Sequence, residues 1–313
     1  MPHDHCGHGH HHHGHHHHHA PNNFGTRFAI GAGINLLFVG AEVFFGIISQ
    51  SLALLADAVH NFSDVIGLLM AWGGAWLARL APTAKRTYGY RSASFLAALA
   101  NACLLFLVTG AIIIEAVQRF GNPADIASNT VVIVASIGIA VNFGTAMLFW
   151  HGQKDDLNVR GAFLHMMADA AISLGVVVAA LVIRYTGWQW VDPVTSLLIA
   201  AVIIYGSWGL AIEALNMTMA AVPKNVDIDQ VRDYLSKRPG VTAVHDLHIW
   251  AMSTSEIALT AHLVKPDRTQ SDDAFLVKIA EDLREKFKIG HATIQVETGA
   301  EAQNCRLAEE GSL

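Results

Sequence analysis

The sequence predicts an α-helical membrane protein with six transmembrane helices, followed by a small cytoplasmic α+β domain. Of the 313 residues, 52% are hydrophobic and only 15% are charged, which is too apolar for an ordinary soluble protein. Long apolar runs continue to about residue 218, whereas the sequence after Val222 is rich in charge and in alternating apolar and polar positions. These two observations separate a membrane part from a water-exposed part.

Six stretches have roughly the 20 apolar residues that a transmembrane helix needs. They cover residues 27–48, 53–79, 92–118, 128–150, 160–184 and 191–218. The first 26 residues are polar and do not resemble a cleaved signal peptide. We therefore expect a His-rich, disordered cytoplasmic tail over residues 1–24, a transmembrane domain over 25–222, a cytoplasmic domain over 223–300 and a C-terminal tail over 301–313.

Lys and Arg residues between the spans predict the orientation, because cytoplasmic loops carry the excess of positive charge. The loops after the second and fourth spans hold Arg79, Lys85, Arg86, Arg91, Lys154 and Arg160. With an even number of spans, both termini then face the cytoplasm, and we expect a multi-pass protein of the inner (plasma) membrane. The formal net charge of −6 is modest and argues against nucleic acid as a partner.

Two short patterns inside the spans predict a metal site. His60 and Asp64 lie four residues apart in the second span, and His165 and Asp169 repeat this spacing in the fifth. Residues at i and i+4 share a helix face, so each span offers one imidazole and one carboxylate in the same direction. A lone intramembrane His is often a hydrogen-bonding partner between helices, but the repeated pair favours four ligands around one tetrahedral Zn²⁺.

The charges of this quartet favour exchange of metal against protons. With both Asp ionised and both His neutral, the empty site carries a charge of about −2, which is costly in a bilayer. Zn²⁺ neutralises it, and so do protons. Metal binding requires the deprotonated ligands, so metal and protons compete for the same lone pairs. The sequence therefore predicts a membrane zinc carrier that works as a Zn²⁺/H⁺ antiporter.

Other polar residues also lie within the spans. We interpret Asn35, Glu42, Asn101 and Asn142 as packing or hydrating a polar path. Asp57 lies near the outer end of the second span. It is either a carboxylate beside the metal ligands, a group on the exit side or a plain helix-end residue.

Most of the histidines are at the start of the chain. Of 19 in total, 12 lie within the first 19 residues, and ten of these form a tract over residues 8–19 that two glycines interrupt. This tract has no periodic apolar face and predicts a disordered tail that captures metal. An expression tag is the alternative.

The C-terminal part predicts the order αββαβ. A helix over residues 227–238 has acidic residues in its first turn and ends at Pro239-Gly240. Strands over 244–252 and 256–264 form a hairpin, a helix follows over 272–287, and a third strand covers 292–298. This order gives a two-layer α+β unit.

Several segments resemble the cation diffusion facilitator family, in its bacterial zinc, cobalt and cadmium efflux branch. The stretch SLALLADAVHNFSD over residues 51–64 is similar to the signature of that family. So are KRTYGYR (85–91), LNVRGA (157–162), WVDP (190–193), VHDLHIW (244–250) and TIQVE (293–297). Two departures stand out: residues 80–90 contain no His, Asp or Glu for a second metal found there in some relatives, and Ser94 replaces a common Glu.

The resemblance implies a homodimer of six-span protomers that exports Zn²⁺ from the cytoplasm in exchange for H⁺, and a ferredoxin-like C-terminal domain. Cd²⁺ and Co²⁺ are alternative substrates. A quartet of two His and two Asp goes with zinc preference in this family, and Asp in place of the first His accompanies cadmium tolerance.

The C-terminal domain carries a second candidate zinc site. Strand alternation places His291 and Glu297 on one face, and His245 and His262 come from neighbouring strands. Cys305 from the tail could join them. By resemblance, His245, His262 and His291 match zinc-binding positions in relatives, whereas we expect His248 to pack beside Trp250.

Two other classes of protein compete with a transporter. A membrane-anchored zinc sensor or buffer would explain the His-rich tail and the C-terminal cluster, but not two buried His-Asp pairs. An intramembrane metalloprotease would need a general base, and the sequence has no His-Glu-x-x-His motif. We therefore expect no enzymatic activity.

Overall fold

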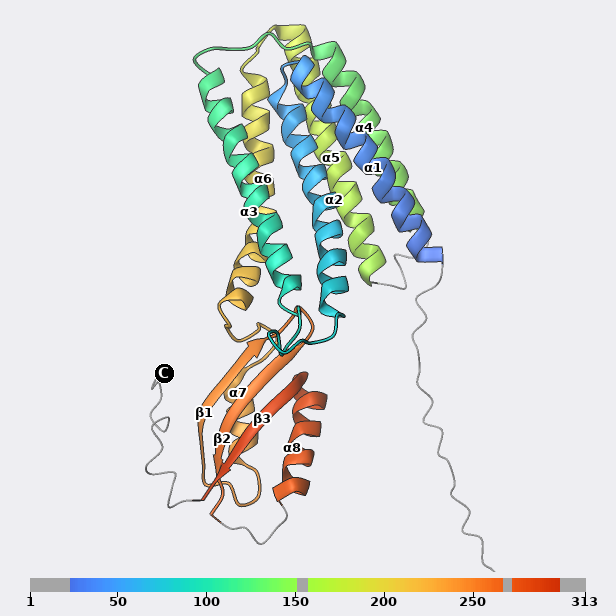
Figure 1. Cartoon of the computed structure of the whole chain (residues 1–313). Coiled ribbons are helices and arrows are strands. Elements are labelled where there is room, and N and C mark those ends of the chain that lie inside the picture. Colours follow the sequence, from blue (N-terminus) through green and yellow to red (C-terminus); the bar gives the residue numbers. More distant parts are fainter. Residues whose placement is uncertain (1–22, 151–156, 267–271, 299–313) are drawn as a thin grey trace, which may run out of the picture.

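The computed structural model describes residues 23–150, 157–266 and 272–298, and it consists of a helix bundle with a small α+β domain at one end (Figure 1). The six long helices are α1 (Asn23–Ile48), α2 (Leu52–Ala78), α3 (Ala93–Arg119), α4 (Ser128–Phe149), α5 (Leu157–Thr186) and α6 (Val191–Thr218). By length and composition α2 to α6 can each cross a membrane, and Gly33–Ile48 of α1 is a shorter apolar helix. The predicted helical membrane fold is confirmed.

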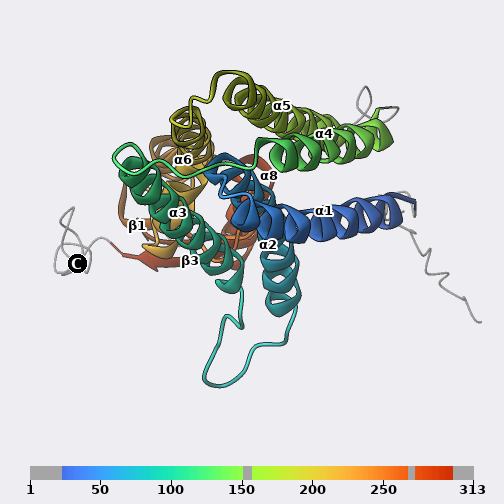
Figure 2. The ribbon, with the colours of Figure 1, turned by 90° about the horizontal axis from the view of Figure 1, so that it is seen from above.

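The helices pack in pairs. α4 runs along α5 and α3 along α6, while α2 contacts α1, α3, α5 and α6 (Figure 1 and Figure 2). Their shared core includes Phe38, Leu54, Val131, Val176 and Ile203. Gly138 of α4 allows a close approach, because a Cβ there would lie 2.8 Å from the Phe38 ring. The central position of α2 brings its polar face against α1 and α5.

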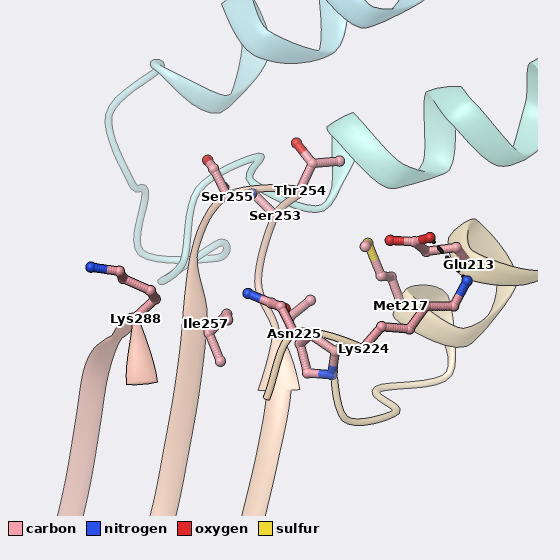
Figure 3. A pocket seen from close by; sticks show the side chains of 11 residues that line it. Glu213, Met217, Lys224, Asn225, Ser253, Thr254, Ser255, Ile257 and Lys288 are labelled. Atoms are coloured by element: carbon pink, nitrogen blue, oxygen red, sulfur yellow. Dashed lines mark hydrogen bonds and ion pairs between the residues drawn. The ribbon is translucent and has the colours of Figure 1, made fainter. Parts of the chain in front are cut away.

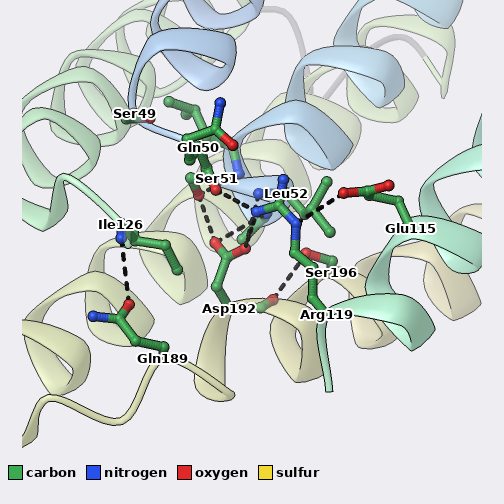
Figure 4. A network of polar contacts seen from close by, with 12 residues as sticks. Ser49, Gln50, Ser51, Leu52, Glu115, Arg119, Ile126, Gln189, Asp192 and Ser196 are labelled. Atoms are coloured by element: carbon green, nitrogen blue, oxygen red, sulfur yellow. Dashed lines mark hydrogen bonds and ion pairs between the residues drawn. The ribbon is translucent and has the colours of Figure 1, made fainter. Parts of the chain in front are cut away.

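A polar network fixes the end of the bundle that lies away from the C-terminal domain, which we call the distal end (Figure 4). Asp192, at the start of α6, accepts hydrogen bonds from Ser51 Oγ at 2.6 Å, Leu52 N at 2.8 Å and Ala53 N at 3.3 Å. Its carboxylate therefore caps the N-terminus of α2, where backbone N–H groups have no partner within the helix. Arg119 of α3 lies 4.0 Å from the same carboxylate.

The C-terminal domain has the predicted order αββαβ. Its elements are α7 (Ile228–Ser236), β1 (Ala243–Ala251), β2 (Ile257–Val264), α8 (Asp272–Phe287) and β3 (Ile289–Glu297). The sheet order is β1-β2-β3, with β1 antiparallel and β3 parallel to β2. A parallel pair needs a crossover, which α8 supplies. β3 begins earlier than predicted, because Ile289 is buried and pairs with Ile257.

A bulge interrupts β1. His245 pairs with His262, but His248 pairs with Thr260, so β1 has one more residue than β2 at this point. Asp246 in the bulge has a φ of 49°, in the left-handed region. Bulges of this kind redirect side chains and are frequent next to functional sites.

The loop between α2 and α3 contacts the C-terminal domain. Arg91 Nη1 forms a 2.9 Å ion pair with Glu256 Oε2, and Thr254 N donates a hydrogen bond to Ser94 Oγ at 3.1 Å. Ser94, which stands in place of a Glu of the family pattern, is thus part of this junction.

A pocket of about 260 Å³ lies near this junction, between the end of α6 and the β1–β2 hairpin (Figure 3). The ion pair of Lys224 with Glu213 lies at its edge.

Candidate metal centres

The structure brings the four predicted membrane ligands together. His60 Nε2 of α2 lies 3.2 Å from Asp169 Oδ1 of α5, and His165 Nε2 of α5 lies 3.0 Å from Asp64 Oδ2 of α2. Within each helix the contacts are longer, 4.0 Å from His60 to Asp64 and 3.8 Å from His165 to Asp169. Each imidazole therefore lies between two carboxylates.

These separations match a tetrahedral site. Ligand atoms about 2.0 Å from a zinc ion lie about 3.3 Å from one another in a tetrahedron. The four contacts of the quartet span 3.0 to 4.0 Å. Ligand atoms of His60, Asp64 and Asp169 lie within 4.8 Å of one another, a geometry that can hold a metal ion, and His165 adjoins this group through its 3.0 Å contact with Asp64.

The members of the quartet differ in how exposed they are. Asp64 follows His60 on a helix that runs toward this domain, and His165 precedes Asp169 on a helix that runs away from it (Figure 1). The exposed fractions of the side chains are 31% for Asp64 and 44% for His165. They fall to 17% for His60 and 1% for Asp169. The two members nearer the C-terminal domain are thus more exposed than the two on the distal side.

Beside the quartet and on its distal side the helices enclose further polar groups. Glu42, Asp57, Asn142 and Ser173 are fully buried, and Asn61 is nearly so. The sequence identified most of these residues one by one but not their contacts. A signal was present on α2, because Asp57, Asn61 and Asp64 follow one another at helical spacing on one face.

A second cluster lies in the C-terminal domain. Glu297, at the end of β3, contacts His262 Nδ1 at 2.8 Å and His245 Nε2 at 3.3 Å. The rings of His245 and His262 are 5.1 Å apart. Ligand atoms of these three residues lie within 4.8 Å of one another, a geometry that can hold a metal ion.

Sequence reasoning missed one member of this cluster. Asp246 Oδ2 lies 3.5 Å from His262 Nε2, and Asp246 Oδ1 contacts His248 Nε2 at 2.8 Å. Strand alternation alone could not place it, because the bulge turns Asp246 out of the regular pattern. His248 was expected to pack beside Trp250, but its side chain is 40% exposed and paired with Asp246.

One predicted ligand, His291, is not brought to this cluster. His291 pairs with Ala258 in the sheet, and its ring packs edge-on against Tyr88 of the α2–α3 loop, with 5.7 Å between centroids. It does share a face with Glu297, but six residues of strand separate them by about 20 Å. Cys305 lies outside the described residues, as do the histidines of the N-terminal tract.

Comparison with known families identifies both parts of the chain. Residues 29–218 match the cation efflux transmembrane domain, and residues 223–299 match the cytoplasmic domain of cation efflux proteins. The chain belongs to the cation diffusion facilitator family. Members of this family move metal cations out across a membrane, so the chain is a multi-pass efflux transporter and not an enzyme. Its C-terminal domain is the cytoplasmic domain of the family.

Known relatives match this chain over most of its length and most of their own. The metal cation efflux system protein CzcD of Cupriavidus metallidurans is 37% identical, over 83% of this chain and 82% of the relative. The cadmium, cobalt and zinc/H(+)-K(+) antiporter of Bacillus subtilis is 35% identical over 83% and 84%. The zinc transporter ZitB of Escherichia coli is 33% identical over 93% and 94%. The resemblance to the zinc, cobalt and cadmium branch is confirmed.

Proposed function

We propose that this cation efflux protein exports Zn²⁺ from the cytoplasm in exchange for H⁺, with His60, Asp64, His165 and Asp169 as the transport site. The observation that carries the proposal is the convergence of two imidazoles and two carboxylates from α2 and α5 within 3.0 to 4.0 Å. Two nitrogen and two oxygen ligands suit tetrahedral Zn²⁺. Zinc appears in the names of the relatives from B. subtilis and E. coli, and the former name also supports Cd²⁺ and Co²⁺ as alternative substrates.

The direction of transport follows from which side the site faces. The C-terminal ends of α2 and α4 lie at the same end of the bundle as the C-terminal domain (Figure 1), and the loop after α2 carries Arg79, Lys85, Arg86 and Arg91. In this orientation both termini are cytoplasmic, and the exposed side of the quartet collects zinc from the cytoplasm. The chain would lie in the inner (plasma) membrane as a homodimer, as the resemblance implies.

Protons enter this mechanism by competition. Zinc binds neutral imidazoles and ionised carboxylates, so protonation of these groups on the release side expels it. The protonated quartet carries no net negative charge and can return through the membrane interior at low cost. The empty, doubly negative site returns poorly. Export of zinc is then coupled to entry of protons.

The cytoplasmic cluster of His245, His262 and Glu297 is proposed as a second zinc site with a regulatory or structural role. Asp246, in contact with His262, can supply a further oxygen. His291 would belong to this site only if the second protomer of the homodimer supplied it. Cys305 would belong to it only if the C-terminal tail reached the cluster.

Simultaneous measurement of zinc and proton flux tests the proposed function. The purified full-length chain is reconstituted into vesicles that contain a zinc dye and a pH dye. We expect zinc movement to follow an imposed pH gradient and to be accompanied by proton movement in the opposite direction. Zinc binding without flux would indicate a buffer or sensor. Flux without proton coupling would indicate a channel or uniporter, and either result would contradict the proposal.

A further inference from the structure

The pocket between the end of α6 and the β1–β2 hairpin has no part in the exchange proposed above (Figure 3). It has a volume of about 260 Å³. Glu213 and Met217 line it from α6, Lys224 and Asn225 from the segment after α6, and residues 253–255 from the hairpin. Its walls therefore come from both the membrane part and the cytoplasmic domain.

The length of α6 places this pocket at the level of the lipid headgroups. Trp188 and Trp190, which stack on each other just before α6, are half exposed and mark the distal membrane interface. From Val191 the helix rises about 1.5 Å per residue, so a hydrocarbon core of roughly 30 Å ends about 20 residues later. Glu213 and Met217 lie beyond that point, on the side of the cytoplasmic domain.

The lining of the pocket carries more positive than negative charge. Lys224 and Lys288 are its basic residues and Glu213 its acidic one, and the two lysines lie on either side of the hairpin (Figure 3). Lys224 Nζ donates to Glu213 Oε2 at 3.2 Å, which balances that carboxylate. Lys288 Nζ donates to the backbone oxygen of Glu285 at 3.2 Å and has no acidic partner among the described residues. Each ammonium group has three donors, so both lysines can bind a further, negatively charged ligand.

Neutral donors line the same pocket. The hydroxyl groups of Ser253 and Ser255 lie 3.4 Å apart. The side chains of Asn225 and Thr254 have no hydrogen-bond partner within the part of the chain that the structure describes. Ammonium groups together with amide and hydroxyl donors are the groups that bind phosphate oxygens. The lining therefore fits a phosphate group.

The adjoining face of α6 favours a phosphate that carries acyl chains. Leu210, Glu213 and Met217 follow one another at helical spacing, and Leu210 is 71% exposed. An acyl chain can lie along this face toward the membrane interior while its headgroup reaches the pocket. The cytoplasmic leaflet supplies anionic lipids, and basic pockets at this depth bind their headgroups.

We propose that this pocket binds the headgroup of an anionic phospholipid, with Lys224 and Lys288 as its cationic contacts. A zwitterionic headgroup binds less well, because the same lysines repel its positive amine. The bound lipid contacts α6 and the hairpin together, and so ties the cytoplasmic domain to the membrane. The inference depends neither on the metal that is transported nor on proton coupling.

Photo-crosslinking tests the proposal on the full-length protein. The chain is reconstituted into phosphatidylcholine vesicles that contain a small fraction of phosphatidylglycerol with a photoactivatable group near its phosphate. Mass spectrometry then identifies the labelled peptides. Lys224→Gln and Lys288→Gln each remove one charge, whereas Lys224→Arg keeps it. Lys237→Gln is the matched control, because Lys237 is similarly exposed and also pairs with an acid, Asp233, but lies at the end of the domain away from the membrane (Figure 1).

We expect native protein to be labelled at the end of α6 and on the hairpin, and unlabelled phosphatidylglycerol to compete. Each Gln variant at the pocket should lower this labelling about fivefold. Lys224→Arg and Lys237→Gln should be labelled like the native protein. Native labelling of both pocket variants would overturn the proposal, and so would equal labelling by a phosphatidylcholine probe. Competition by inorganic phosphate would indicate a site for free phosphate instead, and an equal loss with Lys237→Gln would indicate unspecific attraction to surface charge.

Discussion

His60 of α2 lies 3.2 Å from Asp169 of α5, closer than the 4.0 Å that separates it from Asp64 on its own helix. His165 shows the same preference, at 3.0 Å from Asp64 and 3.8 Å from Asp169. The contacts that build the quartet thus cross between helices. Occupancy of the site and the relative position of α2 and α5 are consequently linked, which a carrier that changes its exposure requires.

The proposed role of His60 as a nitrogen ligand leads to a prediction about metal preference. His60→Asp replaces a borderline nitrogen by a hard oxygen and makes the site more acidic. As the family pattern suggests, we expect discrimination against Cd²⁺ to weaken, with a severalfold rise in the ratio of cadmium to zinc flux. Competing fluxes in vesicles measure this ratio. An unchanged ratio would argue against direct contact between His60 and the metal.

The cytoplasmic cluster predicts the number of bound zinc ions. His262→Ala removes the residue that contacts both Glu297 and Asp246, so we expect the loss of one zinc ion per protomer in equilibrium titration. His291→Ala is the control, because this ring packs against Tyr88 instead. Equal zinc binding by native protein and His262→Ala would refute the site. A loss with His291→Ala would show that a second protomer completes it.

The approach of the two His-Asp pairs, the long apolar helices and the αββαβ order were accessible from sequence because each depends on local periodicity. Helical spacing places His60 beside Asp64, and strand alternation identifies the hairpin. The hydrogen bond from Asn61 to Glu42 was not accessible, since it depends on the relative position of α1 and α2. Likewise, Asp246 depends on a bulge, and the position of His291 along β3 depends on the register with β2.

The hydrogen bonds that Asp192 accepts lead to a prediction about the stability of the distal end (Figure 4). Asn at this position keeps only one acceptor oxygen for Ser51 Oγ, Leu52 N and Ala53 N. A buried donor left without an acceptor costs about 1–3 kcal/mol. Asp192→Asn should therefore lower the unfolding temperature of the protein in detergent. Ser196→Ala, one turn later, loses only a bond to the backbone of its own helix and should unfold near the native temperature. Equal stability of both variants would contradict the cap.

The lowered pKa of Asp282 leads to a prediction about how the stability of the cytoplasmic domain depends on pH. A 2.6 Å hydrogen bond from Tyr234 Oη, together with Lys278, lowers the pKa of Asp282. Burial and the same hydrogen bond raise the pKa of Tyr234 to about 12, so it remains a donor at neutral pH. A carboxyl group with a lowered folded-state pKa stabilises the fold above its unfolded pKa of about 3.9, and this contribution is lost as the pH falls through the folded-state pKa.

Asp282→Asn should therefore speed amide hydrogen exchange in α7 and α8 of the full-length protein at pH 7. The difference from the native protein should shrink below about pH 4. Glu281→Gln, at an exposed position of the same helix, is the control and should exchange like the native protein. A difference that stays constant over this pH range would rule out the titration of Asp282 as its cause.

The central claim is that one site, built by α2 and α5, carries zinc through the membrane. Zinc flux into vesicles by Asp169→Ala tests it most directly, with Glu297→Ala as a matched loss of a carboxylate from the cytoplasmic cluster. We predict that Asp169→Ala abolishes zinc flux while the folded protein persists in detergent, and that Glu297→Ala still transports zinc. Near-native flux by Asp169→Ala would contradict the account.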